Sequence, residues 1–340
     1  MRRLGINGFG RIGRAVARAN QLKGQFDLVA INDINPHIEN MAYLLKYDST
    51  YGRYPVDVFA DDQRLVIDGD PVAYSSEQQI SDVSWSAQQI DVLVDSSGIA
   101  KNIELARELV SSGGVSKVIV THSSERVDNE VVMGVNCGSL SSDDKIVSNS
   151  ICDANAIAHV MKWISDEYGV ETGAVTTLHP WLSYQNIVDG PAISQSNPGV
   201  VWTDFALGRS SVSSVIPKNT TAMAAVEKVV PELKGKVMSF SYRIPTGIVA
   251  SSDLTVQVKR AVCQDEIIKF LKAKIDESPY VTANTESLIS HDYEGRTESA
   301  IVDLQWVKVR DNMIKVVLWY ENEYGYSSRV LDLAAALLKL

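Results

Sequence analysis

The stretch RRLGINGFGRIGRAVARANQLKGQFDLVAIND (2–33) decides the fold of the first half of the chain. Residues 2–7 have the composition of a short strand, and residues 11–22 carry apolar side chains at helical spacing. Residues 26–33 form a second apolar run that ends in an aspartate. A strand, a glycine-rich turn, a helix and a second strand make up the βαβ unit that binds dinucleotides.

The turn itself reads GFGRIG (8–13), which matches the pattern GxGxxG. The first glycine permits a tight turn, the second lets the backbone approach a pyrophosphate, and the third permits close packing of helix on strand. Asp33 lies 20 residues past Gly13, where an acid can bind a ribose 2′-hydroxyl and repel a 2′-phosphate. These residues predict NAD rather than NADP, and an ordinary strand–turn–helix is the alternative. The predicted cofactor contacts in this turn are Gly8, Phe9, Gly10, Arg11, Ile12 and Gly13.

The rest of the chain divides into two patterns. Up to residue 150, apolar runs at 91–98, 117–122 and 145–150 alternate with helical segments such as 103–110, which predicts a parallel sheet. A helix is expected over 152–168, and after it long β-type runs dominate, at 174–179, 237–245, 252–260, 300–309 and 313–320. We therefore expect an α/β protein with a Rossmann domain over 1–150 and an α+β domain with a mixed sheet over 151–318. The second domain includes a long loop at 180–214, and residues 319–340 form a C-terminal helix that could dock on the first domain.

The composition excludes several classes of protein. The 340 residues carry a net charge of −10 with no dense basic patch, which argues against a nucleic-acid surface. Three cysteines without CxxC spacing form neither a disulfide framework nor a predicted metal site, so a reducing cytoplasm is expected. The chain has no apolar run near the roughly 20 residues needed to span a membrane, so no membrane association is expected.

Cys152 and His179 are the candidate catalytic pair. Cys152 stands where a strand gives way to a helix, and a helix N-terminus lowers the pKa of a thiol. His179 ends an apolar strand, where side chains face the ligand site of an α/β fold, whereas His159 lies within the helix and is expected to pack. A buried, inert cysteine is the alternative that the residues alone leave open.

Twelve motifs, colinear over essentially the whole chain, resemble the glyceraldehyde-3-phosphate dehydrogenase family, which includes erythrose-4-phosphate dehydrogenases. They are INGFGRIGR (6–14), IND (31–33), YDSTYGRY (47–54), VMGVN (132–136), SN..C..N (148–155), TTLH (176–179), VDGP (188–191), VIPKNT (215–220), PELKGK (231–236), YRIPT (242–246), DLTV (253–256) and WYENEYGYSSRV (319–330).

The resemblance implies a mechanism and roles for particular residues. Cys152 attacks an aldehyde to form a thiohemiacetal, hydride passes to NAD, and a thioester remains for phosphate to attack. His179 activates the thiol and acts as acid and base. Asn322 holds the nicotinamide carboxamide, and Ser97 and Thr121 lie near the cofactor. Arg243 sits between two phosphate sites, and relatives are usually tetramers, so a homo-oligomer is expected.

The chain departs from the family pattern around both anion sites. Where the family reads SNASCTTNC, this chain reads SNSICDANA, so that Ile151 and Asp153 replace hydroxyl residues beside the nucleophile. Leu182 and Tyr184 replace two threonines that hold the substrate's phosphate, while Thr220 is kept. The 23 residues between Pro191 and Val215 are more than usual, which places Trp202 or Phe205 in a reshaped pocket wall.

These departures are consistent with three hypotheses about the function. The favoured one is an NAD-dependent dehydrogenase of a different aldehyde, with water or another group as acyl acceptor and Asp153 positioning that water. The second is a phosphorylating glyceraldehyde-3-phosphate dehydrogenase that relies on Arg243 and Thr220. The third is an NAD-binding relative without catalysis, which the joint presence of Cys152, His179, Asn322 and Asp33 argues against.

Overall fold

The computed structural model describes residues 1–194 and 197–340, and it divides the chain into two compact units. The first unit contains residues 1–131, 138–149 and 327–340, and the second contains residues 132–137 and 150–326. These bounds differ from the predicted domains in two places. Residues 132–137 group with the second unit, and the C-terminal residues 327–340 group with the first, where Lys23 pairs with Asp332 at 2.9 Å.

The elements of the first unit follow the predicted alternation of strands and helices. They are β1 (Arg2–Asn7), α1 (Arg11–Lys23), β2 (Phe26–Asn32), α2 (Ile38–Lys46), β3 (Tyr47–Asp48), β4 (Gly52–Arg53), β5 (Val58–Asp61), β6 (Arg64–Ile67), β7 (Asp70–Ser75), the 3-10 turns η1 (Ile80–Asp82) and η2 (Trp85–Gln88), β8 (Val92–Asp95), α3 (Asn102–Ser111), β9 (Lys117–Val120), β10 (Asn129–Glu130) and β11 (Ile146–Ser148).

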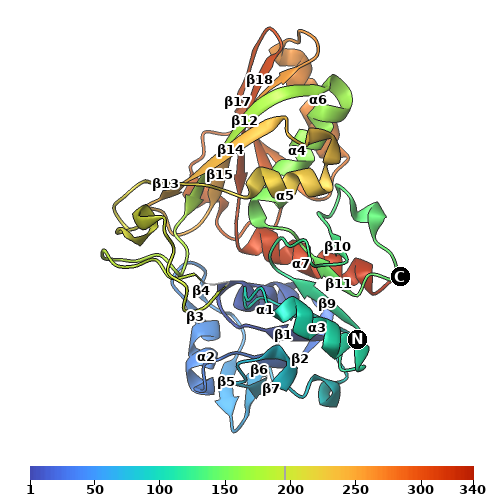
Figure 1. The fold of residues 1–340 in the computed structure, drawn as a ribbon, viewed down its shortest axis with the longest axis vertical. Coiled ribbons are helices and arrows are strands. Elements are labelled where there is room, and N and C mark those ends of the chain that lie inside the picture. The colour runs from blue at the N-terminus through green and yellow to red at the C-terminus, as the bar shows by residue number, and fades with distance from the viewer. Residues whose placement is uncertain (195–196) are drawn as a thin grey trace. The chain divides into compact units, whose positions relative to one another are not determined.

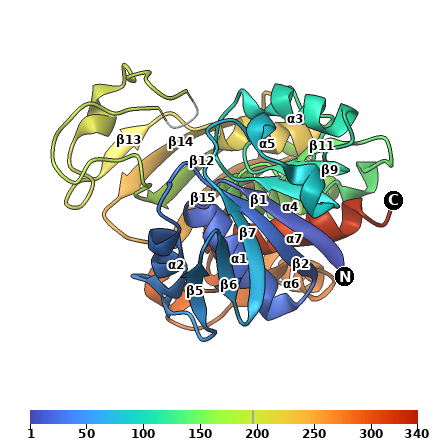
Figure 2. The same cartoon turned by 90° about the horizontal axis from the view of Figure 1, so that it is seen from below.

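The nine-stranded sheet of this unit has the order β10-β11-β9-β8-β1-β2-β7-β6-β5. All pairs from β10 to β7 are parallel, as the sequence predicts, but β7, β6 and β5 pair antiparallel and extend one edge (Figure 2). The sequence did not predict this edge because its strands are short and two tight turns, at Asp62 and Gly69, separate them. Beneath the parallel strands lies an apolar core that includes Trp85, Leu93 and Ile103.

Two glycines of the GFGRIG turn are required by the packing between β1 and α1. Gly8 has φ +85°, and a Cβ there would lie 2.5 Å from the backbone nitrogen of Ser97. A Cβ on Gly13 would lie 2.2 Å from the carbonyl oxygen of Gly8, closer than any tolerated contact. Gly10 differs, because a Cβ there would have no heavy atom within 4 Å. The turn therefore has no room for a side chain at Gly8 or Gly13, whereas the space beside Gly10 is free of protein atoms.

The second unit contains the mixed sheet and three helices. Its elements are α4 (Cys152–Tyr168), β12 (Val170–Pro180), η4 (Phe205–Gly208), β13 (Ile216–Lys218), α5 (Ala222–Val229), η5 (Pro231–Leu233), β14 (Val237–Ile244), β15 (Ala250–Val258), α6 (Gln264–Asp276), β16 (Val281–Asn284), η6 (Ser290–Tyr293), β17 (Ala300–Arg310) and β18 (Met313–Tyr320). The 3-10 turn η3 (Cys137–Ser139) and helix α7 (Tyr324–Leu337) each cross from this unit into the first.

The seven-stranded sheet has the order β13-β14-β12-β15-β18-β17-β16. The β14–β12 and β17–β16 pairs are parallel and the others antiparallel, so the predicted mixed sheet is confirmed. Helices α4, α5 and α6 lie along one face and share a single apolar core with the strands (Figure 1). The other face leaves Met238, Phe240 and Trp306 exposed. Alternate residues of the strands therefore face the helices, and α4, which begins at Cys152, packs on β12, β15, β17 and β18.

The sequence did not single out α5 and α6 among the β-type runs. In α6 the signal is present, because Ile267, Leu271 and Ile275 are buried at four-residue spacing and Asp265 and Glu266 lie in the first turn. None of the helices in the described residues is long and apolar enough to cross a membrane.

Two predicted segments have different structures from those expected. Residues 319 and 320 belong to β18, so the C-terminal helix begins only at Tyr324. The long loop at 180–214 contains the turn η4 and a bridge between Ile193 and Val201, and its residues 195–196 lie outside the described residues.

We predict that Gly13→Ala destabilises the protein, whereas Gly10→Ala is nearly neutral. The methyl group at residue 13 meets fixed backbone, and overpacking of this kind costs about 1–3 kcal/mol. Urea unfolding followed by circular dichroism measures both free energies of unfolding. Equal stability of the two variants would show that the turn is not closed as described.

Candidate active site

A sharp change of chain direction precedes the candidate nucleophile. Ser150 has φ +55°, in the left-handed region that a side-chain-bearing residue rarely adopts, and Ile151 then precedes the first helical residue, Cys152. The hydroxyl of Tyr326 donates to the carbonyl of Ser150 at 3.0 Å and holds this conformation. The turn therefore places Cys152 at the first position of α4.

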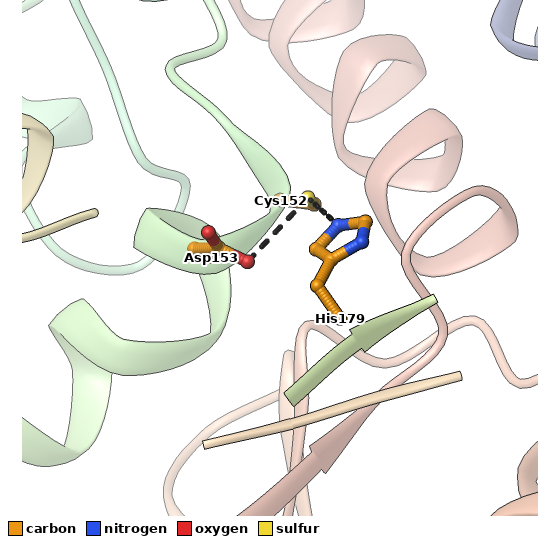
Figure 3. Close-up of side chains that lie close together, drawn as sticks. All are labelled: Cys152, Asp153 and His179. Carbon is orange, nitrogen blue, oxygen red and sulfur yellow. Dashed lines mark hydrogen bonds between the residues drawn. The ribbon is translucent and has the colours of Figure 1, made fainter. Parts of the chain in front are cut away.

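Cys152 and His179 meet, as the sequence predicts. The Sγ atom of Cys152 lies 3.5 Å from Nε2 of His179, which comes from the end of β12 (Figure 3). The other ring nitrogen, Nδ1, lies 2.8 Å from the carbonyl oxygen of Pro180 and donates its proton there. This bond leaves Nε2 with a lone pair directed at the thiol. His159 is fully buried between the rings of Trp163 and Tyr280, as expected of a packing residue.

Asp153 lies next to the thiol on its other side (Figure 3). One carboxylate oxygen, Oδ1, lies 3.8 Å from Sγ of Cys152 and accepts a 2.6 Å hydrogen bond from the hydroxyl of Tyr320. Ser252 donates to Tyr320 at 3.4 Å in turn. Asp153 and Tyr320 are both buried, so the carboxylate is held in place by a buried hydrogen-bond chain. The sequence did not predict the contact between Tyr320 and Asp153. That contact depends on the pairing of β18 in the sheet, which places Tyr320 against the start of α4.

The charges around the thiol set the pKa of each group. Burial raises the pKa of Cys152 well above its usual value, and the negative charge of Asp153 raises it further, against a smaller opposing effect of Arg243. The expectation that the helix terminus would lower this pKa is therefore wrong, because burial and the carboxylate outweigh it. Burial and Arg243 lower the pKa of His179 to about 4, so the histidine is neutral. At neutral pH the pair is a thiol beside a neutral base.

A cationic wall, formed by Arg243 and Lys218, lies beside the pair. Arg243 on β14 is the register partner of His179, and its Nη2 donates to the hydroxyl of Tyr184 at 3.2 Å. Lys218 on β13 acts electrostatically on His179 and Asp153, and burial together with Arg243 lowers its pKa. Two of the predicted anion residues, Arg243 and Tyr184, are thus brought together. Lys218 was not predicted, although it lies in the motif VIPKNT.

The remaining anion-site residues have other contacts. The backbone N–H of Leu182 donates to the side-chain oxygen of Gln185 at 3.0 Å. The hydroxyl of Thr220 accepts from the backbone nitrogen of Ala222 at 3.2 Å, near the start of α5. Trp202 packs edge-on against Tyr184 with ring centroids 5.0 Å apart, whereas Phe205 is 82% exposed. Of the two aromatic residues considered for the pocket wall, Trp202 is the one that contacts a candidate substrate residue.

The glycine-rich turn has the features that a dinucleotide requires. The backbone nitrogen of Phe9 donates to a carboxylate oxygen of Asp33 at 2.6 Å, which joins the turn to the end of β2. Helix α1 has no side-chain cap at Gly10, and a Cβ on Gly10 would have no heavy atom within 4 Å, so the chain leaves room in front of the helix start. Free N–H groups at a helix N-terminus bind the phosphates of a dinucleotide. Gly8, Gly10, Gly13 and Asp33 are thus compatible with NAD, and their contacts to it stay predictions.

Other predicted cofactor residues have structural contacts of their own. Arg11 pairs with Asp48 at 2.5 Å, and Ile12 is half-buried in the first turn of α1. The hydroxyl of Thr121 donates to Asp95, and that of Ser97 accepts from Ile99 and Asn102. In the second unit, Oδ1 of Asn322 accepts from Val249, a residue at φ +67°. These bonds order the residues, and their roles toward the cofactor stay predictions.

Comparison with known proteins agrees with this arrangement. Residues 2–103 match the family model described as the NAD binding domain of glyceraldehyde 3-phosphate dehydrogenase, and residues 151–322 match that of its C-terminal domain. The chain belongs to the glyceraldehyde-3-phosphate dehydrogenase family. Its N-terminal α/β domain is thus an NAD-binding domain, and Cys152, Asp153 and His179 all lie within the segment that matches the family's C-terminal domain.

Relatives in this family match the chain along its whole length. The chain is 39% identical to glyceraldehyde-3-phosphate dehydrogenase 2 of Saccharomyces cerevisiae, with all of both chains covered. It is 37% identical to glyceraldehyde-3-phosphate dehydrogenase of Salmonella typhimurium and 36% identical to glyceraldehyde-3-phosphate dehydrogenase A of Escherichia coli, with 99% of each chain covered.

We predict that Asp153→Asn lowers the pKa of Cys152, because it removes a negative charge that raises this pKa. The pH midpoint for alkylation of Cys152 by iodoacetamide then moves to lower pH. Mass spectrometry measures the rate on a background with Cys137→Ser and Cys263→Ser. The control Asp166→Asn, on the exposed side of the same helix, leaves the midpoint unchanged. An unmoved or raised midpoint in Asp153→Asn would contradict the electrostatic account.

Proposed function

We propose that this family member oxidises an aldehyde with NAD through a covalent Cys152 intermediate and transfers the acyl group to water rather than to phosphate. Asp153 is the residue on which this proposal rests. Its buried carboxylate lies 3.8 Å from the thiol, at a position where the family pattern has a threonine hydroxyl that helps bind phosphate.

The acylation half of the reaction uses Cys152 and His179. As the sulfur attacks the carbonyl carbon, the thiol proton passes to Nε2 of His179, and the carbonyl π pair moves to oxygen. The protonated His179 returns that proton to the oxyanion, which gives a neutral thiohemiacetal. NAD, when bound, accepts the hydride from the former carbonyl carbon. His179 takes the hydroxyl proton in the same step, and a thioester on Cys152 remains.

The deacylation half uses Asp153. Water attacks the thioester carbon, its proton passes to the Asp153 carboxylate, and the carbon–sulfur bond breaks. The departing thiolate takes back the proton held by His179, and Asp153 releases the proton from water to solvent, so that the products are a carboxylic acid, the free thiol and one proton. The hydrogen bond from Tyr320, at 2.6 Å, supports this role because it fixes the carboxylate beside the sulfur.

Electrostatics favours water over phosphate as the acceptor. A phosphate oxyanion about 5 Å from the Asp153 carboxylate is repelled by about 3 kcal/mol per charge pair at an effective dielectric constant near 20. Ile151, on the other side of the cysteine, offers no hydroxyl to offset this repulsion. Water carries no charge and benefits from a base.

The substrate side retains positive charge but has lost hydroxyl donors. Arg243, Lys218 and the hydroxyl of Tyr184 remain for a polar or anionic tail, while Leu182 provides only an apolar surface. We infer an aldehyde whose tail is held by Arg243 and packs near the Tyr184–Trp202 pair. The two cations and the full-length similarity to glyceraldehyde-3-phosphate dehydrogenases favour a second candidate, in which the substrate is glyceraldehyde 3-phosphate and phosphate remains the acceptor.

We further propose a homotetramer in the cytoplasm. The exposed Met238 and Phe240, neighbours on β14, and the exposed Trp306 on β17 support association, since exposed large apolar side chains favour an interface. Free thiols at Cys137, Cys152 and Cys263 support a reducing compartment. Light scattering on the purified protein tests the assembly, and a monomer at micromolar concentration would contradict it.

We predict phosphate-independent formation of NADH. Purified protein with NAD is offered glyceraldehyde 3-phosphate and unphosphorylated aldehydes, each with and without inorganic phosphate, and NADH is followed by absorbance. The favoured function gives turnover with at least one aldehyde at a rate that phosphate does not raise, whereas turnover of glyceraldehyde 3-phosphate that requires phosphate supports the second candidate.

Two variants control this experiment. Cys152→Ser is expected to abolish turnover, and His179→Asn to lower it by about 10²–10⁴-fold. NAD binding that survives in a protein inert toward every aldehyde would instead indicate a binding protein without catalysis.

A further inference from the structure

Cys152, Asp153 and His179 have a second property that the dehydrogenase reaction does not use. One sulfur, one carboxylate oxygen and one imidazole nitrogen all lie within 4.8 Å of one another. Within residues 1–194 and 197–340, no other three His, Cys, Asp or Glu side chains bring their ligand atoms together in this way. The cysteine spacing in the sequence gave no reason to expect a metal site, because adjacent residues on one helix and a strand end supply the three atoms.

The distances fit a tetrahedral ion. With metal–ligand bonds of about 2.0–2.3 Å, two ligand atoms on a tetrahedral zinc lie about 3.5 Å apart. The Sγ–Nε2 distance is 3.5 Å, and the Sγ–Oδ1 distance is 3.8 Å. Two of the three ligand pairs therefore lie near the spacing of zinc ligands, and the third pair, between His179 and Asp153, lies within 4.8 Å.

The neighbouring hydrogen bonds also resemble those around bound metals. Metal-binding histidines usually donate their second ring N–H to a carbonyl, and Nδ1 of His179 does so toward Pro180 at 2.8 Å. Metal-binding carboxylates are usually hydrogen-bonded as well, and Tyr320 donates to Asp153 at 2.6 Å. Both groups are thus oriented by a partner other than the metal.

We propose that Cys152, Asp153 and His179 bind one Zn²⁺ ion per chain, reversibly, and that this ion inhibits the dehydrogenase by occupying the nucleophile. The set of one sulfur, one nitrogen and one oxygen suits zinc, whereas Mg²⁺ and Ca²⁺ require oxygen ligands. The thiol of Cys152 loses its proton to solvent as the ion binds, and the thiolate and the carboxylate together then balance the charge of the ion. Arg243 and Lys218, which act electrostatically on this site, oppose a cation and keep the affinity below that of structural zinc sites.

The proposal does not depend on which acyl acceptor the enzyme uses, because the ion binds to the resting side chains. The proposal does depend on Asp153, because a serine or threonine at this position would offer no anionic ligand. Three protein ligands leave a fourth position for water.

Binding is tested on the full chain with Cys137→Ser and Cys263→Ser, so that Cys152 is the only thiol. Competition with a chromophoric chelator measures the stoichiometry and affinity for Zn²⁺, and Mg²⁺ serves as the control ion. We expect one Zn²⁺ per chain, at least tenfold weaker binding in Asp153→Asn, and no change in Asp166→Asn. Co²⁺ in place of Zn²⁺ is expected to show a thiolate-to-metal charge-transfer band.

Chemical protection gives a second measurement that does not rely on activity. Zn²⁺ at the binding stoichiometry is expected to block alkylation of Cys152, and EDTA to restore it. Tyr320→Phe, which keeps all three ligand residues and removes only the hydrogen bond to Oδ1 of Asp153, is expected to weaken binding by about tenfold or more. Circular dichroism checks that each variant is folded. Equal Zn²⁺ affinity in wild type and Asp153→Asn, or alkylation unaffected by Zn²⁺, would overturn the proposal.

Discussion

Asp153 places a buried carboxylate 3.8 Å from the thiol of Cys152, and Tyr320 holds it there with a 2.6 Å hydrogen bond. A buried charge beside a nucleophile raises its pKa, repels anions and attracts protons and cations. Each of these effects has a consequence in the site. The thiol rests protonated beside His179, and in the proposed function water is a better acceptor than phosphate. The same charge completes a set of ligands for zinc.

The positive side of the site balances this carboxylate. Arg243 lies in register with His179, and Lys218 lies two residues beyond the register partner of Arg243, so that both cations come from neighbouring strands. Tyr184 joins Arg243 and is itself packed by Trp202 from the long loop. The site thus combines a carboxylate at the nucleophile with two cations, which in the proposed function hold the tail of the substrate. Whether the substrate carries a phosphorylated tail is therefore a separate question from whether phosphate is the acyl acceptor.

The sequence predicts the parts of the fold that depend on local spacing. The GFGRIG turn, Asp33 and the strand–helix alternation identify the NAD-binding domain, and the meeting of Cys152 with His179 follows from a helix start and a strand end. Tyr320 and Lys218 could not be predicted in the same way, because their positions depend on the register of distant strands. The raised pKa of Cys152 was also missed, since local spacing does not reveal burial. The antiparallel edge β5–β6 escaped prediction because its strands are only four residues long.

The most direct test of the role of Asp153 is pre-steady-state NADH formation by Asp153→Asn, with the aldehyde that wild type oxidises fastest. If Asp153 is the base for deacylation, the variant releases a burst of about one NADH per chain, and its steady rate then falls about 100-fold or more. Mass spectrometry would find the acyl group on Cys152 during the slow phase. A steady rate equal to that of wild type, with no accumulated acyl-enzyme, would contradict the account.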